Sequence, residues 1–333
     1  MDGIGREDLS IITTLKKLFW SAYVACYKTR DLCNLYKPVI DLNRDIGQTV
    51  LVLGSARSGT TWIGDVISSM LKARRIFEPF LLDKNRQFYL STHKRLCEDN
   101  LDRRLQLYIR QHDEENVYAP QIEKILGGNI RSAWSNKGCN VGIYWRRVIK
   151  EVKANLFMAY IATNWPQVKI IWVIRNPLNV IESQMTMGQM NFFFDWNIHD
   201  VKNQPELLSD WLHPLMSEMT LAKSICVRLA HKWCIETYVP LKQGVEKLPN
   251  VLKVRYEDLT GNLKEWNRIC NFLSPMSCDT TKLQKWLNTP SRTSRKFYLD
   301  GRRDIEKAIS ISEKESDEIR RIVDLYGLSS FLS

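Results

Sequence analysis

A single stretch decides how this sequence folds: Leu53-Gly54-Ser55-Ala56-Arg57-Ser58-Gly59-Thr60-Thr61-Trp62. The apolar, β-branched run at 49–53 precedes it, and a segment with helical periodicity begins at its end. A strand that runs into a loop with two glycines, and from there into a helix, directs backbone N–H groups and the helix dipole at a phosphate. The hydroxyl groups of Ser58, Thr60 and Thr61 add donors. The stretch therefore predicts a phosphate-binding loop.

The glycine spacing of this loop is also that of the nucleoside-triphosphate P-loop, Gly-x4-Gly-Lys-Ser/Thr. Thr60 stands where that loop carries its lysine. Kinases and ATPases use the lysine on the β- and γ-phosphates, and a strand-end aspartate helps to hold Mg²⁺. Here the cation comes earlier, at Arg57, and the second strong strand ends in Arg175. A P-loop nucleotide kinase or other phosphotransferase stays open as an alternative that lacks these two groups.

Apolar strands and amphipathic helices alternate along the chain. Near-continuous apolar strands separated by helices predict an α/β fold, a single domain with a central, mainly parallel β-sheet flanked by helices. Ligands of such sheets bind beyond the carboxyl ends of the strands. We expect an N-terminal helical extension over 1–46, packed on a domain at 47–333. The predicted strands are 49–53, 169–174 and 251–254, with weaker candidates at 75–77 and 140–144; the predicted helices are 61–72, 147–163, 178–187, 216–238, 263–273 and 313–326.

A second motif lies in KIIWVIRNPLNVIESQM, residues 169–185. Arg175 stands at the end of the predicted strand, and Pro177 suits the first turn of the helix that follows. Ser183 is eight residues after Arg175, about two turns along that helix. The guanidinium and the hydroxyl can therefore converge on one phosphate.

Together these segments resemble the PAPS-dependent sulfotransferases, which use 3'-phosphoadenosine-5'-phosphosulfate (PAPS) as donor. SARSGTTW at 55–62 resembles their 5'-phosphosulfate loop, commonly PKSGTTW, and Arg175 with Ser183 has the spacing of their 3'-phosphate motif. The resemblance spans roughly residues 48–300. It implies a P-loop-kinase-like sulfotransferase fold, release of PAP and no metal. The implied donor-binding residues are Arg57, Ser58, Gly59, Thr60, Thr61, Trp62, Arg175, Ser183, Tyr256, Arg295 and Lys296.

Three of these matches are weaker than the two motifs. Tyr256, in the RYEDL segment at 255–259, resembles a tyrosine that contacts the nucleotide, and core packing is an equal alternative. Arg295 and Lys296 stand for a late Arg-Lys-Gly; Phe297 replaces the glycine, so only the cationic role carries over. Trp62 resembles the residue that stacks on adenine, and it also suits a core tryptophan.

The resemblance implies catalytic roles for Arg57 and Glu78. Sulfuryl transfer is an in-line displacement that needs a base for the acceptor and positive charge for the leaving phosphate. Arg57, which stays protonated, would stabilise that phosphate. Ile76-Phe77-Glu78-Pro79-Phe80 is similar to the FEP pattern of branches that use a glutamate base, and an apolar strand end can raise a carboxyl pKa. The alternatives are a buried Glu78 paired with a neighbouring arginine, or His93 or His112 as base.

Charge and composition leave the acceptor open. The chain has 333 residues and a formal net charge of +11, which suits an anionic partner without identifying it. A non-catalytic nucleotide- or RNA-binding protein is a further alternative, although no nucleic-acid motif is present. Eight cysteines form no CxxC pair, and no Cys/His cluster has zinc spacing.

The start of the sequence, MDGIGREDLS, lacks the basic and apolar segments of an export signal. We therefore expect a soluble cytoplasmic enzyme without stable membrane insertion or bound nucleic acid. Its expected acceptor is a hydroxyl or amine of a small molecule such as a natural product. The aromatic run Phe192–Trp196 is a candidate acceptor lid, with core packing as the alternative, and the oligomeric state stays open.

Overall fold

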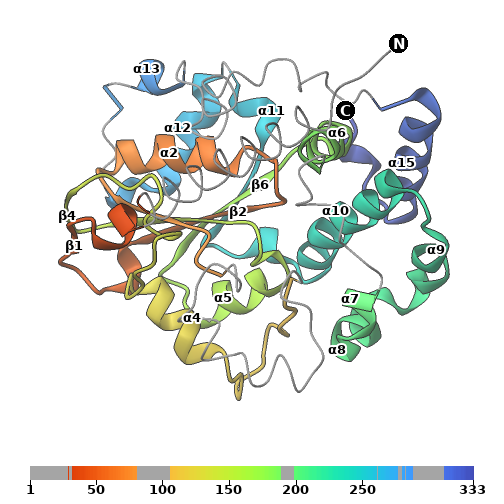
Figure 1. Cartoon of the computed structure of the whole chain (residues 1–333), viewed down its shortest axis with the longest axis horizontal. Coiled ribbons are helices and arrows are strands. Elements are labelled where there is room, and N and C mark those ends of the chain that lie inside the picture. Colours follow the sequence, from red (N-terminus) through yellow and green to blue (C-terminus); the bar gives the residue numbers. More distant parts are fainter. Residues whose placement is uncertain are drawn as a thin grey trace, which may run out of the picture.

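The computed structural model describes residues 29, 32–80, 106–188, 199–260, 262–276, 280–281, 283–287 and 311–333. A five-stranded parallel sheet forms the centre, in the order β3-β5-β2-β6-β7 (Figure 1). Its strands are β2 (Thr49–Gly54), β3 (Arg74–Phe77), β5 (Arg147–Glu151), β6 (Lys169–Ile174) and β7 (Val251–Arg255). The central strand β2 is buried along its whole length. The predicted α/β fold with a parallel sheet is confirmed.

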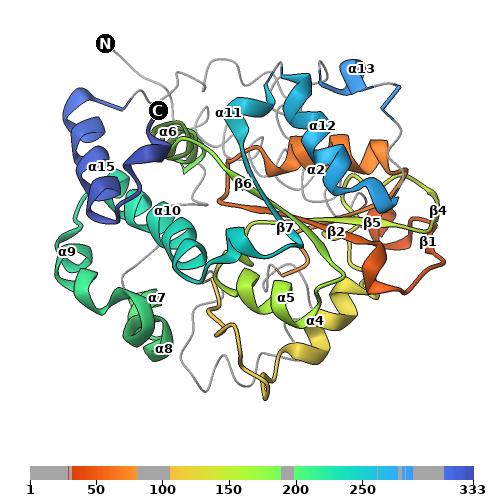
Figure 2. The same ribbon diagram turned by 180° about the vertical axis from the view of Figure 1, so that it is seen from behind.

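Helices cover both faces of the sheet, and alternate residues of β2 explain why. Val50 and Val52 pack with α2 (Thr60–Met70), α12 (Leu263–Phe272) and α13 (Leu283–Leu287), whereas Leu51 and Leu53 face the other side. Figures 1 and 2, seen from opposite sides, show α2 and α12 above the strands and α4 and α5 below. The second layer contains α4 (Ala119–Leu126), α5 (Met158–Asn164), α6 (Pro177–Gly188), α10 (Ile225–Lys242) and α15 (Glu313–Leu325).

Two predicted helices differ from the structure. The helix predicted over 147–163 is wrong: this segment contains β5, a 3₁₀ turn at Asn155–Phe157 and then α5. Residues Arg147–Glu151 lie between β3 and β2 and are buried throughout, so sheet pairing overrides local helix propensity. The helix predicted over 216–238 is divided into α9 (Met216–Leu221) and α10, and Ser224 caps the second part.

The remaining elements are short. A separate parallel pair joins β1 (Val39–Asp41) to β4 (Gly142–Tyr144), so part of the 1–46 region is a strand. The other short elements are η1 (Ile46–Gln48), α7 (His199–Lys202), α8 (Pro205–Leu207), a π-helix at Leu208–Leu212, η4 (His213–Leu215), η5 (Val245–Lys247), α11 (Tyr256–Leu259), η6 (Ser274–Met276) and η8 (Ser329–Phe331). Within the described part of the chain, no helix has the length and apolarity needed to cross a bilayer.

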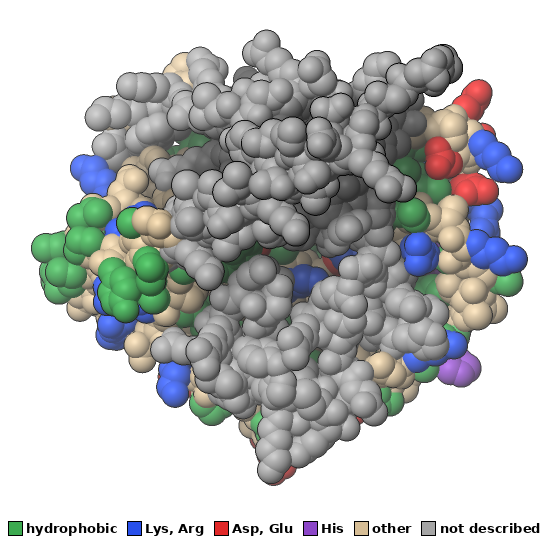
Figure 3. Space-filling view, in the orientation of Figure 1, with side chains coloured by type: hydrophobic (Ala, Val, Ile, Leu, Met, Phe, Trp, Pro, Cys, Tyr) green, Lys and Arg blue, Asp and Glu red, His purple; other side chains and the backbone are tan. Residues whose placement is uncertain are grey.

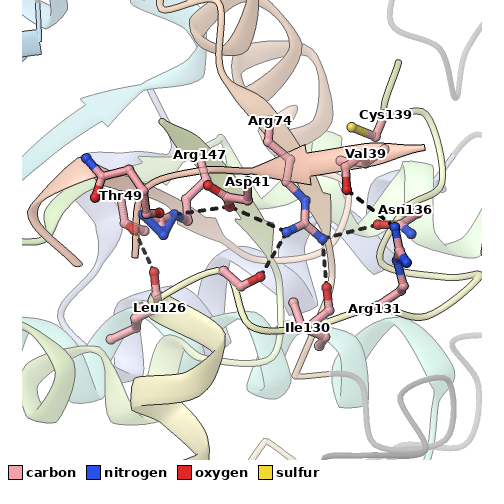
Figure 4. Close-up of polar contacts among 12 residues, drawn as sticks. Val39, Asp41, Thr49, Arg74, Leu126, Ile130, Arg131, Asn136, Cys139 and Arg147 are labelled. Carbon is pink, nitrogen blue, oxygen red and sulfur yellow. Dashed lines mark hydrogen bonds and ion pairs between the residues drawn. The ribbon is translucent and has the colours of Figure 1, made fainter. Parts of the chain in front are cut away.

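A buried ion cluster ties the β1–β4 pair to the amino ends of the main strands (Figure 4). The Asp41 carboxylate lies 3.4 Å from Arg74 Nη1 and 3.7 Å from Arg147 Nε. Arg74 also donates to the carbonyls of Gly128 and Ile130, at 2.8 and 2.7 Å. Burial lowers the pKa of Arg74, and the Asp41 charge opposes that shift. Gly128 has φ +73°, and a Cβ there would lie 2.4 Å from Asp41 Oδ2.

Candidate functional site

The loop after β2 has two residues with left-handed backbone conformations, and only one of them is a glycine. Ser58 N donates to Ser55 O at 3.1 Å, and both Arg57 (φ 73°) and Gly59 (φ 83°) are left-handed. Gly59 precedes the first residue of α2, whose first-turn N–H groups lack helical partners and can bind an anion. The left-handed arginine, in contrast, is a strained conformation of the kind that clusters at functional sites.

Both glycines of the loop are required by close contacts. A Cβ at Gly54 would lie 2.4 Å from Val173 O, because the backbone of β6 passes against the end of β2. A Cβ at Gly59 would lie 2.2 Å from Tyr256 Cε2, because the tyrosine ring packs on the loop. The loop is therefore shaped by β6 on one side and by the residue after β7 on the other.

The two motifs predicted from the sequence meet at this loop. Arg57 Nε donates to Ser183 Oγ at 2.9 Å, so the cation of the first motif reaches the helix of the second. Arg175 Nη1 donates to Arg57 O at 3.0 Å, and Gln184 Nε2 donates to Ala56 O at 2.8 Å. Arg57, Arg175 and Ser183 thus form one connected cluster at the carboxyl ends of β2 and β6.

Tyr256 belongs to the same cluster. The guanidinium carbon of Arg175 lies 4.6 Å from the centre of its ring, a cation–π distance. Trp62 is half-buried and meets the Tyr256 ring at 6.0 Å and the Trp266 ring at 5.5 Å, both edge-on. Thr60 is buried and Thr61 half-buried in the first turn of α2. Arg295 and Lys296 lie outside the described residues.

Several buried polar atoms of the cluster have no hydrogen-bond partner among the described residues. They are Ser58 Oγ, Arg175 Nε and Gln184 Oε1. A buried polar group without a partner costs free energy unless a ligand satisfies it. Two arginines, the start of a helix and an unmet hydroxyl fit an anionic phosphate or sulfate group.

Asn176 helps to position the second motif, a role that the sequence alone did not predict. Its Oδ1 accepts from Leu178 N at 3.0 Å at the start of α6, which is a helix-capping bond. Its backbone N–H donates to Glu257 Oε1 at 2.9 Å. Glu257 directly follows Tyr256, so the segment after β7 supports both the ring and the helix that carries Ser183.

Glu78 directly follows the edge strand β3. Its N–H donates to Lys150 O at 2.8 Å, and its carboxylate forms an ion pair with Lys150 Nζ. The neighbouring cation is therefore a lysine of β5, not the arginine considered from the sequence. Glu78 has φ 41°, a left-handed conformation that is rare for a glutamate and costs about 1 kcal/mol or more. His112, the other described candidate base, is exposed, and His93 lies outside the described residues.

A second carboxyl, Glu151, lies beside Glu78 and was missed from the sequence. It is fully buried at the end of β5 and accepts from the N–H groups of Phe80 (2.8 Å), Val152 (2.7 Å) and Lys153 (2.9 Å). Burial, and next the charge of Glu78, raise its pKa to about 7, although the three N–H donors oppose this. By bonding to Phe80, Glu151 fixes the turn that begins at Glu78.

A buried polar network extends from the loop to α10. Asn155 Nδ2 lies 3.4 Å from Gly54 O and 3.3 Å from Gln106 Oε1. Gln106 Nε2 in turn donates to the Glu236 carboxylate, which Lys232 also contacts at 2.6 Å. Nearby, burial and then the charge of Lys232 lower the pKa of Lys153 to about 8. These residues are far apart in the sequence, so no local sequence pattern predicts that they form a network. The candidate lid at 192–196 lies outside the described residues.

Comparison with known proteins identifies the family. The model of the Sulfotransferase family matches residues 49–275, well over half of the chain. A search of curated protein sequences finds no match. Similar solved structures include the sulfotransferase domain of the Synechococcus PCC 7002 olefin synthase (15% identity, 84% of this chain and 94% of that chain, TM-score 0.43). Another is the mouse sulfotransferase SULT7A1 complexed with PAP (15% identity, 88% of this chain and 91% of that chain, TM-score 0.42).

Retinol dehydratase in complex with androsterone and PAP gives 17% identity, 84% of this chain and 80% of that chain, and a TM-score of 0.38. The family match over 49–275 covers the loop, both arginines and the segment after β7. The chain belongs to the sulfotransferase family.

Proposed function

We propose that this sulfotransferase takes its sulfuryl group from PAPS and transfers it to a hydroxyl or amine of a small molecule, releasing PAP. The observation that supports PAPS most strongly is the contact between Arg57 and Ser183, with Arg175 beside them. The two cations and the serine come from two separate motifs, which suits a ligand with two anionic groups. PAPS carries both a 5'-phosphosulfate and a 3'-phosphate, so it uses both motifs.

In this proposal the chain's groups divide the work of an in-line displacement. The acceptor oxygen or nitrogen forms a bond to sulfur while the bond from sulfur to the bridging oxygen of the 5'-phosphate breaks. The leaving PAP takes that electron pair, and Arg57 and the first turn of α2 stabilise its charge. Ser58, Gly59, Thr60 and Thr61 hold the phosphosulfate. Arg175 and Ser183 hold the 3'-phosphate, together with Arg295 and Lys296 by resemblance.

Glu78 is the proposed base that takes the acceptor proton. It stands at the carboxyl end of a strand, where ligands of parallel sheets bind. Its left-handed backbone and its ion pair with Lys150 support a carboxylate held in a fixed position, as a base needs. Tyr256 and Trp62 supply ring surfaces beside the loop for the adenine.

Nucleotide-dependent stabilisation tests the donor. A ligand that binds only the native state raises the melting temperature of the protein. If PAPS is the donor, PAP should therefore raise the melting temperature more than ATP, GTP or ADP does at equal concentration. ADP lacks the 3'-phosphate, so the Arg175→Ala variant should reduce the advantage of PAP over ADP. Stronger stabilisation by ATP with Mg²⁺, accompanied by ATP turnover, would instead support the phosphotransferase alternative.

The Glu78→Gln variant tests the base. We expect turnover to fall by about 10²- to 10⁴-fold, which is the usual contribution of general base catalysis, while PAP still stabilises the protein. Glu123→Gln, an exposed glutamate on α4, is the matched control. Unchanged turnover in Glu78→Gln would remove Glu78 from this role without affecting the donor assignment.

A further inference from the structure

The small sheet β1–β4 and the residues next to it carry most of their apolar side chains on the solvent side. Val39 is buried and the Asp41 side chain joins the ion cluster, whereas Ile40 and Leu42 point outward. The register places Ile40 opposite Ile143, so outward residues of the two strands are neighbours. We call the five outward residues the β1–β4 patch; they are between 49% and 63% exposed, and they are Ile40, Leu42, Val141, Ile143 and Trp145.

This patch is not the ordinary scatter of exposed apolar residues. Among the described residues, seven of the large exposed hydrophobic side chains lie in segments 32–42 and 141–145, and four lie elsewhere. Single exposed apolar residues need no explanation, but a contiguous group marks a surface that binds something. A half-exposed strand pair normally turns its apolar side inward. Here Asp41, held by two buried arginines, occupies the inner side.

The segments that contain the patch are rich in positive charge. The segments 32–46 and 131–146 contain five Lys or Arg residues that are exposed or half-exposed, against one exposed carboxylate, Asp45. Figure 3 shows the hydrophobic side chains beside Lys and Arg side chains at the left edge of the molecule, where Figure 1 draws β1 and β4. The five cations are Lys37, Arg44, Arg131, Lys137 and Arg146, of which Lys137 packs on the rings of Phe77 and Trp134.

From this combination we propose that the β1–β4 patch binds the surface of an anionic lipid bilayer. Trp and Tyr with aliphatic side chains occupy the boundary between headgroups and acyl chains, and Lys and Arg keep their charge among the headgroups. Tyr36, the most exposed of these aromatic residues, lies just before β1. Each cation near an anionic surface adds about 1 kcal/mol.

A second copy of the chain fits this surface less well. A two-fold dimer would place the same patch on both sides of the interface and would bring the two sets of cations together. Like charges in such an arrangement are costly. An anionic bilayer meets the same cations with opposite charge.

The location of the patch keeps it separate from the nucleotide site. β1 and β4 lie next to the amino ends of β2 and β5, where Thr49 and Arg147 begin those strands. The Arg57 loop and Glu78 follow the carboxyl ends of β2 and β3. A bilayer on the patch therefore leaves the site open, and the proposal does not depend on the proposed function.

Co-sedimentation with vesicles tests this. The full chain should bind vesicles of phosphatidylcholine with phosphatidylserine and should bind pure phosphatidylcholine vesicles much more weakly, with added salt weakening the difference. Arg44→Glu removes one cation and adds one anion, so binding should weaken roughly thirtyfold. Trp145→Ser and Ile143→Ser should each weaken it about tenfold or more. Their positions are exposed, and unchanged thermal melting will show that both variants fold.

Matched controls come from exposed residues elsewhere: Leu221→Ser for the apolar variants and Lys264→Glu for the charge variant. Both should bind vesicles like the wild type. Equal loss in the control and patch variants overturns the proposal, as does the absence of phosphatidylserine-dependent binding. Sedimentation velocity adds a third arm. A wild-type dimer that Ile143→Ser converts to a monomer, with no effect on vesicle binding, assigns the patch to a second copy and also overturns it.

Discussion

The Glu151→Gln substitution should change how stability depends on pH. In the unfolded chain this carboxyl has its ordinary pKa of 4.5, and in the folded protein burial and the Glu78 charge raise it to about 7. Between these values the folded protein keeps a proton that the unfolded chain releases. The free energy of unfolding therefore falls as the pH rises from 4.5 to about 7, and the loss is complete above that. The interval corresponds to roughly 3 kcal/mol.

The amide of Glu151→Gln does not titrate, so this slope should disappear. At pH 5 the variant should be about 1–3 kcal/mol less stable than the wild type, because its NH₂ group cannot accept from buried backbone N–H donors. At pH 8 it should regain roughly 3 kcal/mol relative to the wild type. Urea denaturation across this pH range measures both quantities.

Two further variants sharpen the result. Glu123→Gln, at an exposed position, should run parallel to the wild type at every pH. Glu78→Gln removes the neighbouring charge, so the window in which stability falls should end at a lower pH. Parallel curves for wild type and Glu151→Gln from pH 4.5 to 8 would show that Glu151 takes up no proton on folding, and the reasoning would fail.

Three other substitutions test features of the fold and the site. Asp41→Asn leaves Arg74 and Arg147 buried without a carboxylate and should lower the free energy of unfolding by about 3–5 kcal/mol, measured by chemical denaturation; a loss within experimental error contradicts the buried-pair argument. Ser183→Ala should weaken PAP binding about tenfold in calorimetry, the effect of one lost hydrogen bond, and wild-type affinity would separate this hydroxyl from the donor. Gly59→Ala should lower the free energy of unfolding, because its Cβ meets the Tyr256 ring and because the left-handed φ strains an alanine. Adding Tyr256→Ala in the same chain should recover only the part of that loss that is due to the ring, and full recovery would show that the backbone conformation costs nothing there.

Three strands of the sheet and the donor loop were predictable because their signals are local. The runs at 49–53, 169–174 and 251–254 are mainly apolar, which is typical of strands in a parallel sheet covered by helices, and the structure contains each of them. β5 was not predictable in the same way. Its sequence, RVIKE, has charged residues at both ends, and only pairing with β3 and β2 makes it a strand.

The same distinction applies to the candidate site. The sequence identifies Arg57, Arg175 and Ser183 as site residues because they belong to motifs with fixed spacing. Glu151 and Asn155 acquire their importance from neighbours that the fold supplies: the turn after Glu78 for one, the end of β2 for the other. A single sequence contains no signal for such contacts, because they depend on how β3, β5 and β2 align.

The distances along the chain between the clustered residues have a consequence for folding. Arg57 contacts Arg175 and Ser183, which are 118 and 126 residues away, and its loop packs against Tyr256. Each contact closes a long loop, whose entropy must be lost before the contact can form. Parallel sheets with such high contact order fold slowly. We therefore expect the donor site to assemble in the last stages of folding, so that recovery of PAP binding lags behind recovery of helical circular dichroism in refolding experiments.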